Sequence, residues 1–204
     1  MSAAWIALGV YVVGLLLAFG ARTWMQIRRT GTSGYRGISG RRGSLAWWGG
    51  VLFPAAVLLG LLAPVLALTG ATAPWSPLDH RAAAVTGFIV AIGGLAVVLT
   101  AQTAMGGSWR IGVDEGERTE LVTAGPFGMV RNPIFTGMGA VAIGVALMVP
   151  TPPAAIAAIC LVAAVQIQVR VVEEPYLQRT HGKDYAGYAA RAGRFLPGLG
   201  RIRR

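Results

Sequence analysis

The sequence predicts an all-α, polytopic membrane protein with about five transmembrane helices and a polar helical segment at its C-terminal end. Hydrophobic residues make up 54% of the 204, and charged residues only 13%, about half the share of roughly 25% in soluble domains. The mean hydropathy is +0.59. Five apolar runs approach the roughly 20 residues that a helix needs to cross the hydrocarbon core of a bilayer. We therefore expect a single membrane domain over residues 1–204.

The apolar runs define the expected spans. The first is too long for the core of a cleaved signal peptide, so we expect a retained helix that carries no charge before Arg22. Pro54 and Pro64 fall within the second span, where membrane helices tolerate proline. Pro150-Thr-Pro-Pro153 separates the last two runs and predicts a tight helical hairpin. The expected spans are 4–24, 45–69, 82–105, 134–149 and 154–169.

Positive charges predict the orientation of these spans. The segment 22–42 holds six arginines, 106–133 holds three, and 170–204 holds eight Lys plus Arg, so only Arg81 falls on the other side. The positive-inside rule then puts the C-terminus in the cytoplasm and, with five crossings, the N-terminus outside. Abundant Ala, Gly and Arg with few Lys is typical of a GC-rich bacterium, so we expect the bacterial inner (plasma) membrane.

Several classes of function are excluded by what the sequence lacks. The arginines lie between apolar runs and form no stripe on a soluble surface, so the net charge of +10 does not indicate a nucleic-acid partner. One cysteine, Cys160, excludes an internal disulfide. His80 and His181 fall on opposite predicted sides, so we expect no metal site. The spans carry no ionisable residue at depth, which argues against an ion pump.

Polar residues that could bind a ligand or take part in a reaction are concentrated in two stretches, 121–137 and 170–188, which flank the predicted hairpin. A hairpin brings its two ends together, so Arg131 should meet Glu173 and Glu174 at the same membrane depth. The sequence thus predicts a pocket at this end of the hairpin that combines a cation, carboxylates and aromatic rings.

Each of these residues also has a simpler interpretation. Arg131 alone is typical of an anchor whose long side chain reaches the headgroups. Glu173 and Glu174 alone are typical of a solvated helix face. Tyr185 and Tyr188, which are three apart and share a helix face, are typical of the interfacial aromatic belt. It is their joint placement beside one hairpin that favours a functional site.

The combined pattern resembles the isoprenylcysteine carboxyl methyltransferase family, within the wider group of membrane methyltransferases that includes phospholipid N-methyltransferases. The resemblance covers about the last half of the chain. Asn132 and Phe135 stand where that family usually has His and Tyr. The matching blocks are, in order, Gly107-Ser-Trp-Arg110, Leu121-Val-Thr-Ala-Gly-Pro126, Arg131-Asn-Pro-Ile-Phe-Thr-Gly137, Glu173-Glu174, then Leu177, Gly182, Tyr185, Tyr188 and Arg194-Phe-Leu-Pro197.

The resemblance implies that S-adenosyl-L-methionine binds between the hairpin ends and the C-terminal helix, within segments 107–133 and 170–197. Arg131 and Arg170 are the expected catalytic residues. If Arg131 presents its planar fork to a carboxylate of the acceptor or of the cofactor, Arg131→Lys should reduce activity without reducing stability. The expected cofactor-binding residues are Thr123, Gly125, Pro126, Arg131, Asn132, Pro133, Phe135, Gly137, Glu173, Glu174, Tyr185 and Tyr188.

The function implied is methyl transfer to a lipophilic acceptor, with the carboxylate of an isoprenoid or prenylcysteine-like molecule as the expected target. An ionised carboxylate needs orientation and exclusion of water more than it needs a general base. Three alternatives remain open at this point. They are N-methylation of a phospholipid or other lipid amine, an NADPH-dependent reductase of the sterol-reductase type, and a lipid-binding membrane protein without catalysis. In every case the expected partners are lipophilic molecules and membrane lipids.

Overall fold

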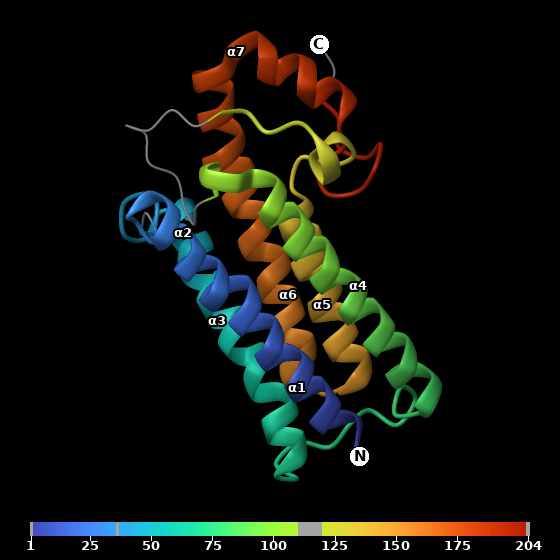
Figure 1. Ribbon diagram of the computed structural model, residues 1–204. Helices are drawn as coiled ribbons and strands as arrows, with labels where there is room; N and C mark the ends of the chain where they lie inside the picture. The colour runs from blue at the N-terminus through green and yellow to red at the C-terminus, as the bar shows by residue number, and fades with distance from the viewer. Residues whose placement is uncertain (1, 36, 110–119, 203–204) are drawn as a thin grey trace.

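The computed structural model describes residues 2–35, 37–109 and 120–202, and Figure 1 shows that its long helices run side by side in one bundle. Every regular element within these residues is a helix. Between the helices, Val130 and Gly193 form an isolated parallel β-bridge. The all-α membrane architecture expected from the sequence is therefore confirmed.

The first long helix is built from three consecutive pieces. α1 (Ala3–Leu15) continues through a π-helical segment, η1 (Leu16–Ala21), into α2 (Arg22–Thr30). Gly31 ends it in the left-handed conformation, with φ of 73°, which glycine adopts without a steric penalty. The helix is longer than the predicted span 4–24 because Arg22 and Gln26 are buried against protein and extend the packed face beyond the apolar run.

The second span, α3 (Leu45–Leu68), agrees with the prediction to within one residue. Ser44 caps its first turn, where the Ser44 hydroxyl accepts a hydrogen bond from the backbone N–H of Trp47 at 3.2 Å. The helix continues without interruption through Pro54 and Pro64 and packs along α6.

The next two spans, α4 (Arg81–Met105) and α5 (Pro133–Met148), form the tightest pair in the bundle. A Cβ atom on Gly94 would lie 2.6 Å from the carbonyl oxygen of Gly137, and one on Gly144 would lie 2.5 Å from that of Gly87. Glycine is needed at these four positions because the two backbones touch. Gly137 and Gly144 of α5 thus allow the two helices to approach closely, whereas Gly139 on the same helix faces open space.

The hairpin partner, α6 (Pro152–Ile167), continues through a second π-helical segment, η4 (Gln168–Glu173), into the polar helix α7 (Glu174–Arg191). The sequence predicted a separate C-terminal segment, whereas the structure has one helix that leaves the apolar bundle and then bends. The bend falls at Gly182, with φ of 49°, a conformation that favours glycine.

The connections between the helices lie at the two ends of the bundle. Figure 1 shows the start of α1 and the α3–α4 and α5–α6 connections at one end of the bundle, and α2 and α7 at the other. Among the described residues, four helices are long and apolar enough to span a membrane, and α5, at 16 residues, is a shorter apolar helix. This arrangement brings both ends of the predicted hairpin to the end of the bundle where α7 begins.

Candidate functional site

A cavity of about 430 Å³ lies where the first helix, α3, α4, the start of α5 and the α6–α7 junction converge. Its volume is in the usual range for ligand sites. Its lining is of two kinds. Polar side chains are contributed by Glu120, Arg131, Asn132, Gln168, Glu173 and Glu174, and apolar ones by Phe19, Phe53, Val98, Phe135 and Met138, among others.

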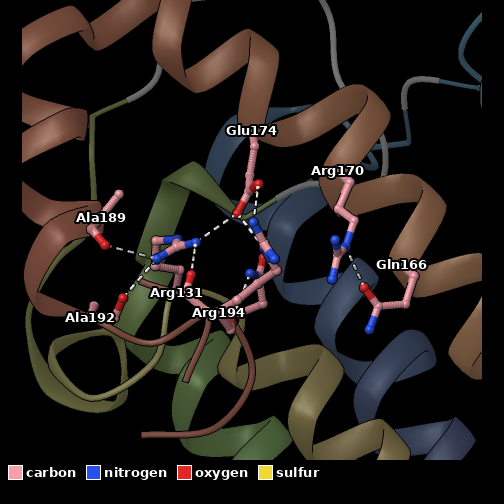
Figure 2. A network of polar contacts seen from close by, with 9 residues as sticks. Arg131, Gln166, Arg170, Glu174, Ala189, Ala192 and Arg194 are labelled. Atoms are coloured by element: carbon pink, nitrogen blue, oxygen red, sulfur yellow. Dashed lines mark hydrogen bonds and ion pairs between the residues drawn. The ribbon is translucent and has the colours of Figure 1, made fainter. Parts of the chain in front are cut away.

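Arg131 binds the C-terminal segment through both of its terminal nitrogens. Nη1 donates to the carbonyl oxygens of Ala189 and Ala192 at 3.1 and 2.7 Å, and Nη2 donates to Glu174 Oε1 at 2.8 Å and to the Gly200 carbonyl at 3.0 Å. Figure 2 shows the guanidinium between Glu174, Ala189 and Ala192, and only 7% of the residue is exposed. The four N–H groups of Nη1 and Nη2 are thus engaged within the protein.

Glu174 receives a second arginine from the C-terminal turn. Arg194 Nε donates to Glu174 Oε1 at 2.8 Å and Arg194 Nη2 donates to Oε2 at 3.0 Å, a bidentate pair. Burial opposes ionisation of Glu174, but the hydrogen bonds from Arg194 and Arg131 outweigh it and hold the pKa of this carboxyl below its ordinary value. The same contact raises the pKa of Arg194. We call Arg131, Glu174 and Arg194 the arginine clasp.

Backbone pairing extends the clasp along the start of α5. The N–H of Arg131 donates to the Gly193 carbonyl at 2.7 Å, and the side-chain amide of Asn132 donates to the Arg194 carbonyl at 3.0 Å. The Thr136 hydroxyl donates to the Phe195 carbonyl at 2.7 Å. Two of the blocks singled out in the sequence, residues 131–137 and 194–197, therefore lie side by side, and Asn132 serves as a hydrogen-bond donor in this contact.

An aromatic wall closes the side of the cavity formed by α7. The rings of Tyr185 and Tyr188 meet edge to face with centroids 6.3 Å apart, and the Tyr188 hydroxyl donates to the Phe127 carbonyl at 2.8 Å. Burial raises the pKa of both tyrosines to about 12, so both hydroxyls stay protonated near neutral pH. The wall is therefore uncharged near neutral pH.

Most of the predicted site residues line the cavity. The expected meeting of Arg131 with the glutamate pair is confirmed at Glu174, at 2.8 Å. Glu173 lines the cavity as well, and its Oε1 accepts a hydrogen bond from Gln168 Nε2 at 3.3 Å. The predicted residues that the cavity brings together are Arg131, Asn132, Pro133, Phe135, Glu173, Glu174, Tyr185 and Tyr188.

Other predicted residues lie away from the cavity lining. Arg170 is exposed, donates to Gln166 Oε1 at 2.7 Å, and stands apart from the clasp in Figure 2. Gly137 serves the α4–α5 contact. Thr123, Gly125 and Pro126 precede α5, the last two within the short 3₁₀ turn η3 (Gly125–Gly128). Arg110, within the expected cofactor segment 107–133, lies outside the described residues.

Some residues that line the cavity were not predicted from the sequence. Phe19 and Phe53 come from the first two spans, which lie outside the part of the chain that carries the family resemblance. No local sequence pattern distinguishes these two phenylalanines from the other apolar residues of the spans. Trp109 stood within one of the matching blocks without a role, and Tyr176 follows the glutamate pair by two positions. An aromatic residue beside a polar block was the signal available for these last two.

Comparison with known proteins agrees with this geometry. The family model for phospholipid methyltransferases matches residues 82–184, which is half of the chain and runs from α4 through the hairpin to the bend in α7. No curated protein matches the chain. The matched segment contains the α4–α5 pair, Arg131, Glu173 and Glu174, and so carries the core of the cavity. The chain therefore belongs to the phospholipid methyltransferase family, a family of membrane methyltransferases that includes the isoprenylcysteine carboxyl methyltransferases.

Proposed function

We propose that this protein is an S-adenosyl-L-methionine-dependent methyltransferase that modifies a lipophilic acceptor at the membrane. The observation that carries the proposal is that the cavity has a polar side and an apolar side. Its polar lining lies at the α6–α7 junction, and its apolar lining consists of side chains from the membrane helices. A polar methyl donor and a hydrophobic acceptor need such a combination in one space. Membership of a methyltransferase family favours this interpretation over an NADPH-dependent reductase.

The polar lining has the groups that S-adenosyl-L-methionine requires. Its ammonium and ribose hydroxyls suit the Glu173 carboxylate and the Gln168 amide, and its adenine suits the ring faces of Tyr185 and Trp109. When bound, it would supply a methyl group on a positively charged sulfur. When a nucleophile attacks the methyl carbon, the carbon–sulfur bond breaks and the sulfur leaves as a neutral thioether. Arg131 holds the polypeptide around this space, because its Nη groups already bind Glu174 and three carbonyls.

The apolar lining suits a hydrocarbon chain. Phe19, Val98 and Met138 line the main cavity and also a second, apolar cavity of about 60 Å³ deeper in the bundle. A chain entering from the bilayer could place its polar end beside the glutamates and its tail between the helices. Exclusion of water by such a tail would favour the transfer, since it removes the hydration shell of the nucleophile.

We propose a carboxylate as the nucleophile, on an isoprenoid or prenylcysteine-like acceptor. A carboxylate is ionised near neutral pH and attacks without a general base, whereas a lipid ammonium must first lose a proton. Among the described residues that line the cavity there is no histidine to take that proton. The carboxylate of Glu173 is the group that would have to take it from a phospholipid amine, which is the second candidate acceptor.

We also propose the orientation in the membrane. The helices α2 and α7, which carry Arg28, Arg29, Arg179 and Arg191, lie at the end of the bundle that holds the cavity. Positive charge is typical of the cytoplasmic side. The site would then face the cytoplasm, where the methyl donor is made, with the N-terminus outside. The composition favours a bacterial inner membrane.

The experiment begins with binding to the purified protein in detergent. We expect S-adenosyl-L-methionine to bind and NADPH not to bind. Glu173→Gln should weaken the affinity for S-adenosyl-L-methionine roughly tenfold to 100-fold, the value of a hydrogen bond to a charged group. Arg170→Gln, which changes a charge outside the cavity, is the matched control and should bind like the parent. Binding of NADPH alone, or equal binding by Glu173→Gln, would refute the assignment.

The acceptor is then identified by transfer of a labelled methyl group. The purified protein is offered a farnesylated cysteine carboxylate and, separately, phosphatidylethanolamine in mixed micelles. We expect a base-labile methyl ester on the first. Label on the amine of the second would replace our carboxylate proposal with the second candidate.

A further inference from the structure

Three polar side chains are buried between the first helix and the end of α4. Arg22, Gln26 and Gln102 are each only 3% exposed. Each donates to a backbone carbonyl on the opposite helix or the turn that follows it. Arg22 Nη2 binds the Gly106 carbonyl, Gln26 Nε2 binds that of Gly107 at 3.0 Å, and Gln102 Nε2 binds that of Ala18 at 2.9 Å.

The spacing of these contacts matches the helix period. Ala18, Arg22 and Gln26 are four apart and share one face of the first helix. Ala18 lies in the π-helical segment η1, where the widened turn disturbs the regular helix ladder, and Gln102 supplies a donor to its carbonyl. The face is therefore built to bind α4.

The contact made by Arg22 continues into the cavity wall. Gly106 ends α4 with φ of 54°, a conformation that favours glycine, and its carbonyl accepts from Arg22. The guanidinium also stacks on the Trp109 ring, with Cζ 4.8 Å from the ring centroid. Trp109 is 3% exposed and lines the main cavity. Arg22 thus holds both the turn that carries Trp109 and the ring itself.

We propose that Arg22 is a positioning residue of the site, which acts by fixing the Trp109 ring in the cavity wall. The inference rests on the proposed function, because it assigns Trp109 to the methyl-donor site. It adds that the first helix, which lies outside the family match at 82–184, completes that site. Arg22 is not a headgroup anchor, since its side chain is enclosed by protein.

The chain offers a matched control on the same helix. Arg28 stacks on Trp24 with Cζ 5.1 Å from the ring centroid, but Trp24 is 59% exposed and does not line the cavity. Arg28→Gln removes the same kind of arginine–tryptophan contact as Arg22→Gln without touching the site.

The first measurement reads the ring directly, without any ligand. The protein is labelled with 5-fluorotryptophan, and the fluorine resonance of Trp109 is identified by its loss in Trp109→Phe. We expect Arg22→Gln to move this resonance and Arg28→Gln to leave it in place. A Trp109 resonance that stays unmoved in a folded Arg22→Gln protein overturns the proposal. Arg22→Lys, a milder change, supplies the same comparison if Arg22→Gln does not fold.

The second measurement is a double-mutant cycle on the affinity for S-adenosyl-L-methionine, with Arg22→Gln, Trp109→Leu and both together. We expect each single change to weaken binding roughly tenfold, the order of magnitude for the stacking of a base on an aromatic ring, and the pair to be no worse than Trp109→Leu alone. Arg22→Lys should restore binding only in part, because an ammonium lacks the planar fork. Additive losses, or full recovery with Lys, overturn the role of Arg22. A parent protein that binds no S-adenosyl-L-methionine instead overturns the proposed function.

Discussion

Replacing Arg131 by Lys tests the most heavily bonded side chain of the site. In the structure its two Nη atoms make four hydrogen bonds, to Glu174 and to the carbonyls of Ala189, Ala192 and Gly200. A lysine ammonium carries three donors on a single nitrogen. It cannot reach the four acceptors that surround the two terminal nitrogens of the planar guanidinium. The substitution keeps the charge and removes the geometry.

The free-energy cost follows from the hydrogen bonds that lysine cannot make. At least one hydrogen bond that involves a charged group disappears, and a second disappears if the ammonium moves toward Glu174, so the clasp should be weakened by about 2–5 kcal/mol. No correction for solvent screening applies, because only 2% of the Arg131 side chain is exposed. Since each 1.4 kcal/mol is a factor of ten, the C-terminal segment should open at least about 30 times more often.

Hydrogen exchange of the backbone amides measures this opening. Gly193, Arg194 and Ile202 donate to the carbonyls of Met129, Leu199 and Ala189, so the segment 193–202 reports the clasp. We expect its protected amides to exchange at least about 30 times faster in Arg131→Lys, whereas Arg170→Lys, the same change at an exposed site, leaves them unaltered. Unchanged exchange in Arg131→Lys would refute the clasp and favour the fork-to-substrate role inferred from the sequence.

Two further predictions concern the bundle. Gly144→Val should abolish folded protein on size-exclusion chromatography, because its Cβ would lie 2.5 Å from the Gly87 carbonyl oxygen, whereas Gly139→Val on the same helix meets open space and should fold; a well-folded Gly144→Val would contradict the α4–α5 contact. Reporter fusions after Arg42 should report the cytoplasm and fusions near Asp79 the outside; a cytoplasmic Asp79 would refute the proposed orientation.

The sequence by itself predicted the fold class, the approximate positions of the spans and the meeting of Arg131 with the glutamate pair. Apolar runs of about 20 residues are typical of membrane spans. Pro150-Thr-Pro-Pro153 marks the hairpin that brings Arg131 to the glutamate pair. These are local properties of the chain, and local patterns suffice to predict them.

Only the tertiary structure decided which role each polar residue has. Adjacent helical residues point in different directions, so spacing along the chain cannot tell Glu173 from Glu174; the structure places Glu174 in the clasp and Glu173 beside Gln168. The sequence suggested that Arg131 binds a ligand carboxylate. Its actual partners, apart from Glu174, are backbone carbonyls, and no sequence pattern identifies these. Trp109 and Arg22 meet across 87 positions of sequence. Such contacts depend on the packing of whole helices, and that packing appears in no local pattern.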